Sequence, residues 1–255
     1  MARAALRRRL TPVRWQPAEV SAVHAETQSA RTLTLRVEGW AGHLPGQHVD
    51  VRLTAADGYT ATRSYSISSA PAEGELEITV DEVRGGEVSP YLVRDAAPGD
   101  AVEVRGPLGG WFVWSPDSIR PLQLVAGGSG IAPLMSMLRA RAAAGSTAPA
   151  RLLYSVRRPG AAIFAAELER LAAPGSGLEV TYAYTRAVPP GWPRPAGRVD
   201  ARLLAEAAWP ADRSPDVYVC GPTGFVETAA DLLVAAGHSA TDVRTERFGP
   251  TGSTS

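Results

Sequence analysis

The feature of this chain that most constrains its fold is a change in the period of its apolar residues after residue 114. Before that point apolar and polar residues alternate, as in Leu33, Leu35 and Val37, and the runs are separated by turns rich in Gly, Pro and Asp. Period-two alternation is typical of half-buried antiparallel strands, and short strands at this spacing predict a closed barrel or sandwich. Beyond that point, strand-like runs alternate with helical periods, which predicts βαβ units and a parallel sheet.

We therefore predict two folded domains: a six-stranded antiparallel β-barrel over residues 17–115 and a parallel-sheet, Rossmann-like α/β domain over residues 116–249. The 255 residues are enough for both domains. Residues 1–16 and 250–255 are predicted to be flexible. No apolar segment follows the arginine-rich start, which argues against an export signal, and no apolar run reaches the roughly 20 residues that span a bilayer. We expect a cytoplasmic monomer.

Composition excludes several classes of function. The formal net charge is zero, so no general attraction to nucleic acid or to an anionic membrane is expected. The single cysteine, Cys220, excludes an intramolecular disulfide and an all-cysteine metal or iron–sulfur site within this chain. The four histidines lack metal-ligand spacing, and His48, which alternates with Val49, is expected to point to solvent. No metal site is predicted.

The predicted strand over residues 61–69 carries the sequence Arg63-Ser64-Tyr65-Ser66. Alternation places Arg63 and Tyr65 on one face and Ser66 on the other. A tyrosine offers a flat partner to an isoalloxazine ring, and an arginine can hold a pyrophosphate through two hydrogen bonds. The alternative is an ordinary strand with a surface arginine and a half-buried tyrosine.

A second stretch, Gly85 to Ser89, precedes a short helix predicted over residues 89–95. Ser89 is placed to cap that helix and Pro90 lies in its first turn. Main-chain N–H groups before the helix would form an anion site. A capped helix without a ligand is the alternative.

In the second domain, Gly127 to Gly130 follow a predicted buried strand and open a helix. Glycines at such a turn let the backbone approach a pyrophosphate, although the third glycine of the usual dinucleotide fingerprint is replaced by Pro133. Cys220-Gly221-Pro222 ends another strand, at the carboxyl edge where α/β sheets bind ligands. For Cys220, a small buried apolar residue is the alternative.

Taken together and in this order, residues 63–66, 125–133 and 220–222 resemble the ferredoxin–NADP⁺ reductase superfamily, and the resemblance runs from about Ala18 to Gly252. It implies FAD on the barrel, a nicotinamide nucleotide on the α/β domain, and electron transfer to a separate acceptor protein. It further implies that Ser66 reaches the flavin nitrogen that accepts hydride and that Cys220 aligns the nicotinamide. Phe248 would cover the flavin and Glu246 would donate a proton, with an ordinary last strand as the alternative for Glu246.

The coenzyme is less constrained by the sequence. NAD-specific dinucleotide folds usually place an acid at the end of the second strand, and here that strand ends at Ser155 and Arg157 without one. These two residues, with Arg186 or Arg198, would bind a 2′-phosphate, so NADPH is expected ahead of NADH. A solvated arginine turn is the alternative.

The complete set of predicted cofactor-binding residues falls into two groups. Those of the flavin site are Arg63, Ser64, Tyr65, Ser66, Val80, Gly86, Val88, Ser89 and Phe248. Those of the nucleotide site are Gly127, Gly128, Ser129, Gly130, Ser155, Arg157, Arg186, Arg198, Cys220, Gly221 and Pro222.

The electron acceptor is not encoded in any motif. A ferredoxin, a haem protein or another redox enzyme is the leading expectation, and free flavin, quinone or oxygen is the second. A flavin-carrying subunit of a larger enzyme is the third, disfavoured because such relatives carry a cysteine-rich segment that this chain lacks.

Overall fold

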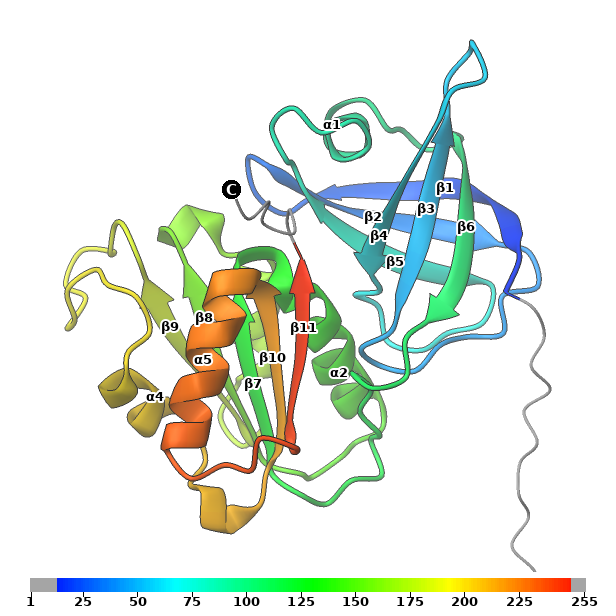
Figure 1. Cartoon of the computed structure of the whole chain (residues 1–255). Helices are drawn as coiled ribbons and strands as arrows, with labels where there is room; N and C mark the ends of the chain where they lie inside the picture. Colours follow the sequence, from blue (N-terminus) through cyan, green and yellow to red (C-terminus); the bar gives the residue numbers. More distant parts are fainter. Residues whose placement is uncertain (1–12, 249–255) are drawn as a thin grey trace, which may run out of the picture.

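The computed structural model describes residues 13–248, which form two domains, each built around its own sheet (Figure 1). The first is a six-stranded antiparallel sheet with the strand order β4-β3-β6-β1-β2-β5. A bridge between Ile67 and Ile78 joins the end of β4 to β5, so the sheet closes into the predicted barrel. The strands are β1 (Trp15–Ala25), β2 (Ala30–Val37), β3 (His48–Thr54), β4 (Thr60–Ser66), β5 (Glu75–Asp81) and β6 (Ala101–Leu108).

The barrel interior is filled by the alternating apolar residues. Leu33, Leu35 and Val37 of β2 are fully buried, and so are Val49 and Val51 of β3, while the residues between those of β2 are more exposed. Each strand therefore presents one apolar face to a common core, as the period-two pattern predicts.

The first strand begins earlier than predicted. β1 starts at Trp15, inside the segment that the sequence suggested to be a flexible extension. The guanidinium groups of Arg52 and Arg105 lie 4.3 and 5.0 Å from the Trp15 ring centroid, so cation–π contacts hold the start of the strand on the outer barrel wall. The remainder of that extension, residues 1–12, and the predicted flexible tail lie outside the described residues.

The short helix α1 (Ser89–Arg94) is not capped by Ser89 as predicted. Its N-cap residue is Val88, which makes no side-chain cap hydrogen bond, and Ser89 is already in the helix. The Oγ atom of Ser89 instead accepts a hydrogen bond from the backbone N–H of Val83, at 3.1 Å. Ser89 thus closes the loop before the helix, and Pro90 supplies the fixed backbone of its first turn.

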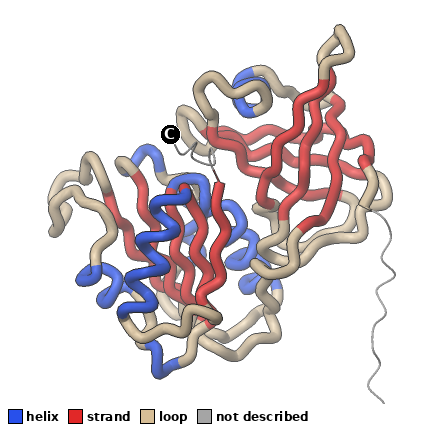
Figure 2. The backbone as a smooth tube through the Cα atoms, in the orientation of Figure 1, coloured by secondary structure: helices blue, strands red, loops and turns tan. Residues whose placement is uncertain are grey.

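The second domain is a five-stranded parallel sheet with the order β11-β10-β7-β8-β9. Helices α2 and α3 pack on one face and α4 and α5 on the other, and Figure 1 shows α5 on the near face. In Figure 2 the helices outside α1 are confined to this domain. The elements are β7 (Leu122–Gly127), α2 (Ile131–Ala143), β8 (Ala150–Val156), α3 (Ala165–Leu171), β9 (Leu178–Tyr184), α4 (Ala201–Ala207), β10 (Asp216–Pro222), α5 (Thr223–Ala235) and β11 (Val243–Phe248).

The strand order defines where this sheet can bind a ligand. From β7 the chain proceeds outward through β8 to β9, and then returns to place β10 and β11 on the opposite side of β7. The reversal lies between β7 and β10, and open α/β sheets bind ligands at the carboxyl ends of the strands at such a point. In the described part of the chain, no helix is long and apolar enough to span a membrane.

Candidate functional site

The carboxyl ends of β7 and β10 approach each other so closely that only glycine fits between them. A Cβ atom on Gly130 would lie 2.2 Å from the carbonyl oxygen of Cys220, and one on Gly127 would lie 2.6 Å from the Phe225 ring. Gly128 has a φ angle of 55°, in the left-handed region that favours glycine. The predicted glycine turn is therefore built into the sheet's switch point, with α2 beginning immediately after it.

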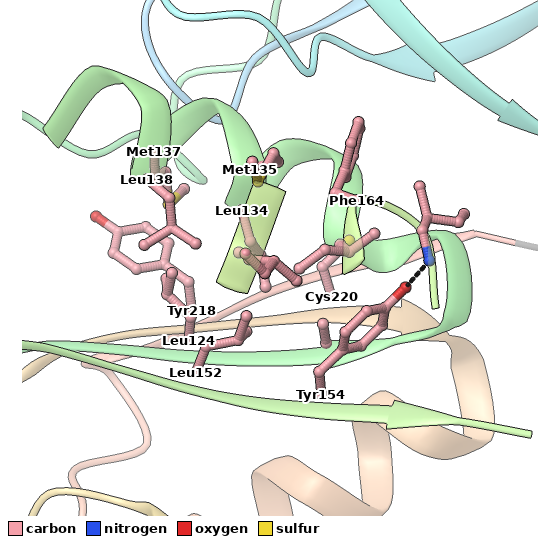
Figure 3. Packing of buried hydrophobic residues seen from close by; sticks show 14 of the residues in the cluster. Leu124, Leu134, Met135, Met137, Leu138, Leu152, Tyr154, Phe164, Tyr218 and Cys220 are labelled. Carbon is pink, nitrogen blue, oxygen red and sulfur yellow. Dashed lines mark hydrogen bonds between the residues drawn. The ribbon is translucent and has the colours of Figure 1, made fainter. Parts of the chain in front are cut away.

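Cys220 lies near the carboxyl end of β10 and belongs to a buried apolar cluster (Figure 3). Its side chain is fully buried. Burial raises the pKa of the Cys220 thiol well above its ordinary value, and the negative charge of Glu246, its register partner on β11, raises it further. A neutral thiol next to a carboxylate is the chemical state that this environment favours.

The structure brings Glu246 against a barrel residue that sequence reasoning missed. Nδ1 of His48 lies 3.5 Å from Oε1 of Glu246, and both side chains are about three-quarters buried, with 27% and 26% exposed. The expectation that His48 points to solvent was wrong, because β11 covers it. Within residues 13–248, Nδ1 of His48 and Oε2 of Glu246 are buried without a hydrogen-bond partner, so the contact leaves two polar atoms unsatisfied.

The predicted flavin strand lies next to this pair. Register pairs Ser66 with His48, while Tyr65 pairs with Val49 and Arg63 with Val51. Arg63 and Tyr65 therefore share a face, and Ser66 lies on the other face with His48, as alternation predicts. Ser66 and Cys220 thus flank the His48–Glu246 contact from the two domains.

On its own face, Tyr65 packs against the barrel core, and burial raises the pKa of its hydroxyl. On the opposite face, Ser64 donates a 2.6 Å hydrogen bond to Asp50, which also accepts one from Arg105 at 2.6 Å. Asp50 and Arg105 thus fix the β3–β4–β6 wall that carries the flavin strand. The hydroxyl of Ser64 is therefore used in a hydrogen bond within the barrel wall.

Arg63 contacts the second segment predicted to bind phosphate, residues 85–89. Its guanidinium is about half exposed and lies 3.4 Å from the carboxylate of Glu87, which also accepts a 3.1 Å hydrogen bond from Tyr59. The chain segments that the sequence suggested as two phosphate contacts are therefore adjacent in space. The side chains of Val80 and Val88 are packed in the barrel core, so only their backbone could contact a ligand.

The end of β8 carries the predicted 2′-phosphate residues. Ser155 is buried opposite Gly127, whereas Arg157, Arg186 and Arg198 are exposed. The backbone N–H of Arg186 donates to the carbonyl of Arg157 at 3.0 Å, which joins two of the three arginine segments. The salt bridges formed within the described residues involve none of these three arginines, so their charges are available to an anion.

The last strand ends over the same region. Phe248 pairs in register with Pro222 and packs, half-buried, against the apolar cluster of the second domain. Ser129 is half-buried in the glycine turn, and Gly221 contacts Gly127 so closely that a Cβ on it would lie 3.1 Å from the Gly127 carbonyl oxygen. The predicted residues of β7, β10 and β11 therefore lie at one edge of the parallel sheet, and the His48–Glu246 contact brings the end of β4, with Ser66, to that edge.

These features fit a nucleotide cofactor on each domain. A cradle of close-packed glycines at a helix start suits a pyrophosphate, and free arginines suit phosphate oxygens. The two buried atoms without partners, on His48 and Glu246, suit a polar ligand between the domains.

Comparison with known proteins gives the same division of the chain. Residues 17–113 match the family model described as "Oxidoreductase FAD-binding domain", and residues 124–231 match the "Oxidoreductase NAD-binding domain". The two matched segments fall on the barrel and on the parallel-sheet domain, respectively.

Among curated proteins, the chain is 30% identical over 207 residues to the toluate 1,2-dioxygenase electron transfer component of Pseudomonas putida, covering 80% of this chain and 58% of the relative. It is 32% identical over 225 residues to an NADPH oxidoreductase of Mycobacterium tuberculosis, covering 85% and 56%. The chain thus spans little more than half the length of these relatives.

Among solved structures, the flavohem-like FAD/NAD binding domain of nitric oxide dioxygenase from Vibrio cholerae superposes with a TM-score of 0.82 at 27% identity. That match covers 92% of this chain and 99% of the other. An Amycolatopsis cytochrome P450 reductase gives a TM-score of 0.81 at 26% identity, covering 94% and 72%. The complete two-domain architecture is therefore shared, not only one of the sheets.

Proposed function

Because the chain belongs to the ferredoxin–NADP⁺ reductase superfamily, we propose that it oxidises NAD(P)H and passes the electrons through FAD to a separate redox protein. The observation that carries the proposal is the convergence of Ser66 and His48 from the barrel with Cys220 and Glu246 from the parallel sheet. FAD, when bound, supplies the conversion of a two-electron hydride into single electrons, and the protein supplies binding and orientation.

The proposed roles of the chain's own residues rest on the resemblance to the family and are supported by their positions. Arg63 binds the FAD pyrophosphate, Tyr65 packs beside the ring, and Ser66 donates a hydrogen bond to it. Gly127 to Gly130 hold the coenzyme pyrophosphate at the start of α2. Cys220 fixes the nicotinamide by contact, and Glu246, which lies against His48 at the junction of the domains, is the proposed proton donor.

The second part of the proposal concerns the coenzyme. Arg157, with Arg186 or Arg198, binds the 2′-phosphate of NADPH, which is supported by the exposure of all three and by the absence of an acid at the end of β8. One curated relative carries the name NADPH oxidoreductase, which agrees with this choice.

The proposed acceptor is a protein, since the similar dioxygenase component is named for electron transfer. Delivery of electrons to free flavin, quinone or oxygen is the second candidate. The two differ in a simple assay: a protein acceptor requires a partner recovered from the native cell, whereas the second needs none.

FAD binding is the test of the proposal. The purified protein should be yellow and release FAD on denaturation, and Arg63→Ala should weaken FAD binding by about 1.5–3 kcal/mol through loss of charge-assisted hydrogen bonds. Fluorescence titration of the apoprotein with FAD measures this. A folded wild-type protein that takes up no FAD would refute the proposed function, and an unchanged affinity in the variant would place the pyrophosphate elsewhere.

A further inference from the structure

Helix α2 is attached to the barrel at the segment that follows the flavin strand. Oγ of Ser136 donates a 2.7 Å hydrogen bond to the carbonyl oxygen of Ser69, and Nη1 of Arg139 donates a 2.9 Å hydrogen bond to that of Ser68. Ser68 and Ser69 follow directly after Ser66 and Ile67 in the sequence. Helix α2 itself begins immediately after the glycine turn. One helix therefore connects the predicted coenzyme phosphate site to the predicted flavin site.

Arg139 is the centre of this attachment. Its Nη1 atom also lies 2.6 Å from the carboxylate of Glu77 on β5, and its Nε and Nη2 atoms make a bidentate pair with Glu167 on α3, at 2.9 and 2.7 Å. The Phe164 ring centroid lies 4.9 Å from the guanidinium carbon. Arg139 thus binds both domains at once.

The environment of this arginine favours a fixed geometry. Its side chain is only 19% exposed, and those of Glu77 and Glu167 are 30% and 25% exposed. Burial opposes the charge, but hydrogen bonds and charge from Glu167 and Glu77 outweigh burial and raise the pKa of Arg139. A planar, bidentate, partly buried pair holds its partners in one orientation, unlike a mobile surface ion pair.

We propose that Arg139 is a positioning residue for hydride transfer, which sets the position of the glycine turn and Cys220 relative to Ser66. The inference rests on the proposed function, because it concerns the step in which one hydride, with its two electrons, leaves the reduced nicotinamide and is accepted by the flavin. That step is sensitive to displacements of about 1 Å, which cost up to about 100-fold in rate. Arg139 touches neither reactant and acts through α2 and the Ser68–Ser69 segment.

The test compares Arg139→Gln with a matched control on the same helix. Arg141 is also buried, but its Nε and Nη2 atoms donate to the carbonyl oxygens of Ala148 and Ser176, within its own domain. Arg141→Gln therefore removes the same charge from the same helix without touching the barrel. Both variants are loaded with FAD, and flavin reduction is followed anaerobically in a stopped-flow instrument over a range of coenzyme concentrations.

Arg139→Gln should retain FAD and lower the limiting reduction rate by about 10- to 100-fold, with a larger isotope effect for deuterated coenzyme and a nearly unchanged coenzyme dissociation constant. Arg141→Gln should lower the melting temperature while keeping the limiting rate. Hydrogen exchange on the two apoproteins gives a readout that needs no cofactor: only Arg139→Gln should accelerate exchange in both residues 67–70 and residues 128–131.

Glu77→Gln provides a second variant, because it weakens the contact from the barrel side and leaves the Arg139–Glu167 pair in place. It should lower the limiting rate in the same direction, and it keeps the inference testable if Arg139→Gln does not fold. A limiting rate equal to wild type in the folded variants would overturn the inference. A wild-type protein that binds FAD but is reduced by neither coenzyme would instead refute the proposed function.

Discussion

Replacing Gly130 with alanine probes the closest backbone approach in the site. The added Cβ would lie 2.2 Å from the carbonyl oxygen and 2.5 Å from the carbonyl carbon of Cys220, and 2.7 Å from the nitrogen of Gly221. All three obstructing atoms belong to the backbone, so no side-chain rotation relieves the overlap. An ordinary contact begins near 3.4 Å, and the turn and β10 must therefore separate by about 1 Å.

This separation has two expected consequences. Overpacking of this kind costs about 1–3 kcal/mol in free energy of unfolding, which corresponds to about 2–4 °C in melting temperature for each kcal/mol. A shift of about 1 Å between Cys220 and the coenzyme turn should lower the rate of flavin reduction by about 100-fold. The two losses are similar in free energy, because a 100-fold slower rate corresponds to about 2.7 kcal/mol of activation free energy.

Gly224→Ala is the matched control for this experiment. Gly224 lies in the first turn of α5 close to the same site, but a Cβ there would meet no atom within 4 Å. It should keep both the melting temperature and the rate of flavin reduction by NAD(P)H within a small margin of wild type. A Gly130→Ala protein that reduces flavin as fast as Gly224→Ala would show that the approach of β7 and β10 does not govern coenzyme position.

Three further changes test other parts of the site. Cys220→Ala should retain FAD but slow flavin reduction, because the thiol is proposed to fix the nicotinamide by contact; a wild-type rate in stopped-flow measurements would leave Cys220 a packing residue. Arg157→Ala should raise the Michaelis constant for NADPH far more than for NADH, and equal losses for both coenzymes, abolished by salt, would indicate only long-range steering. Burial raises the pKa of Asp50, but hydrogen bonds from Ser64 and Arg105 outweigh it and the net shift is downward. The unfolding free energy that wild type gains over Asp50→Asn should therefore be fully present above about pH 4 and disappear as the pH falls through the lower folded-state pKa, as pH-dependent urea titrations can show. A difference that grows on acidification would contradict that sign.

The parts of the fold that follow from local pattern were predictable. The alternation of β2 and β3 fixes which residues face the barrel core, and within the turn after β7 the local backbone geometry requires a glycine at Gly128. The two predicted sheets and their order along the chain are therefore confirmed. In each case the determining interactions join residues close in sequence, or follow from one repeated period.

Two of the three contacts that were missed depend on partners far along the chain, and the third joins residues six positions apart. His48 looked like an outward-facing strand residue, and only the placement of β11 reveals that Glu246 covers it. Arg139 lies at helical spacing among apolar residues and carries no motif, yet it joins the two domains. Serine is a common N-cap residue, but the hydroxyl of Ser89 accepts a hydrogen bond from the backbone N–H of Val83. This bond fixes the loop before the helix and does not cap the helix.

The chemical state of Cys220 limits the roles that this residue can have. A cysteine that acts as a nucleophile needs a low thiol pKa and an exposed, electropositive environment. Cys220 has neither, because it is fully buried and faces the carboxylate of Glu246, and both effects raise the pKa of its thiol. What remains is the shape and polarizability of a neutral sulfur held at the strand end where Gly130 makes its closest approach. Cys220 is therefore expected to act by contact, and the chemistry of the site depends on how rigidly α2 and β10 hold that contact against the barrel.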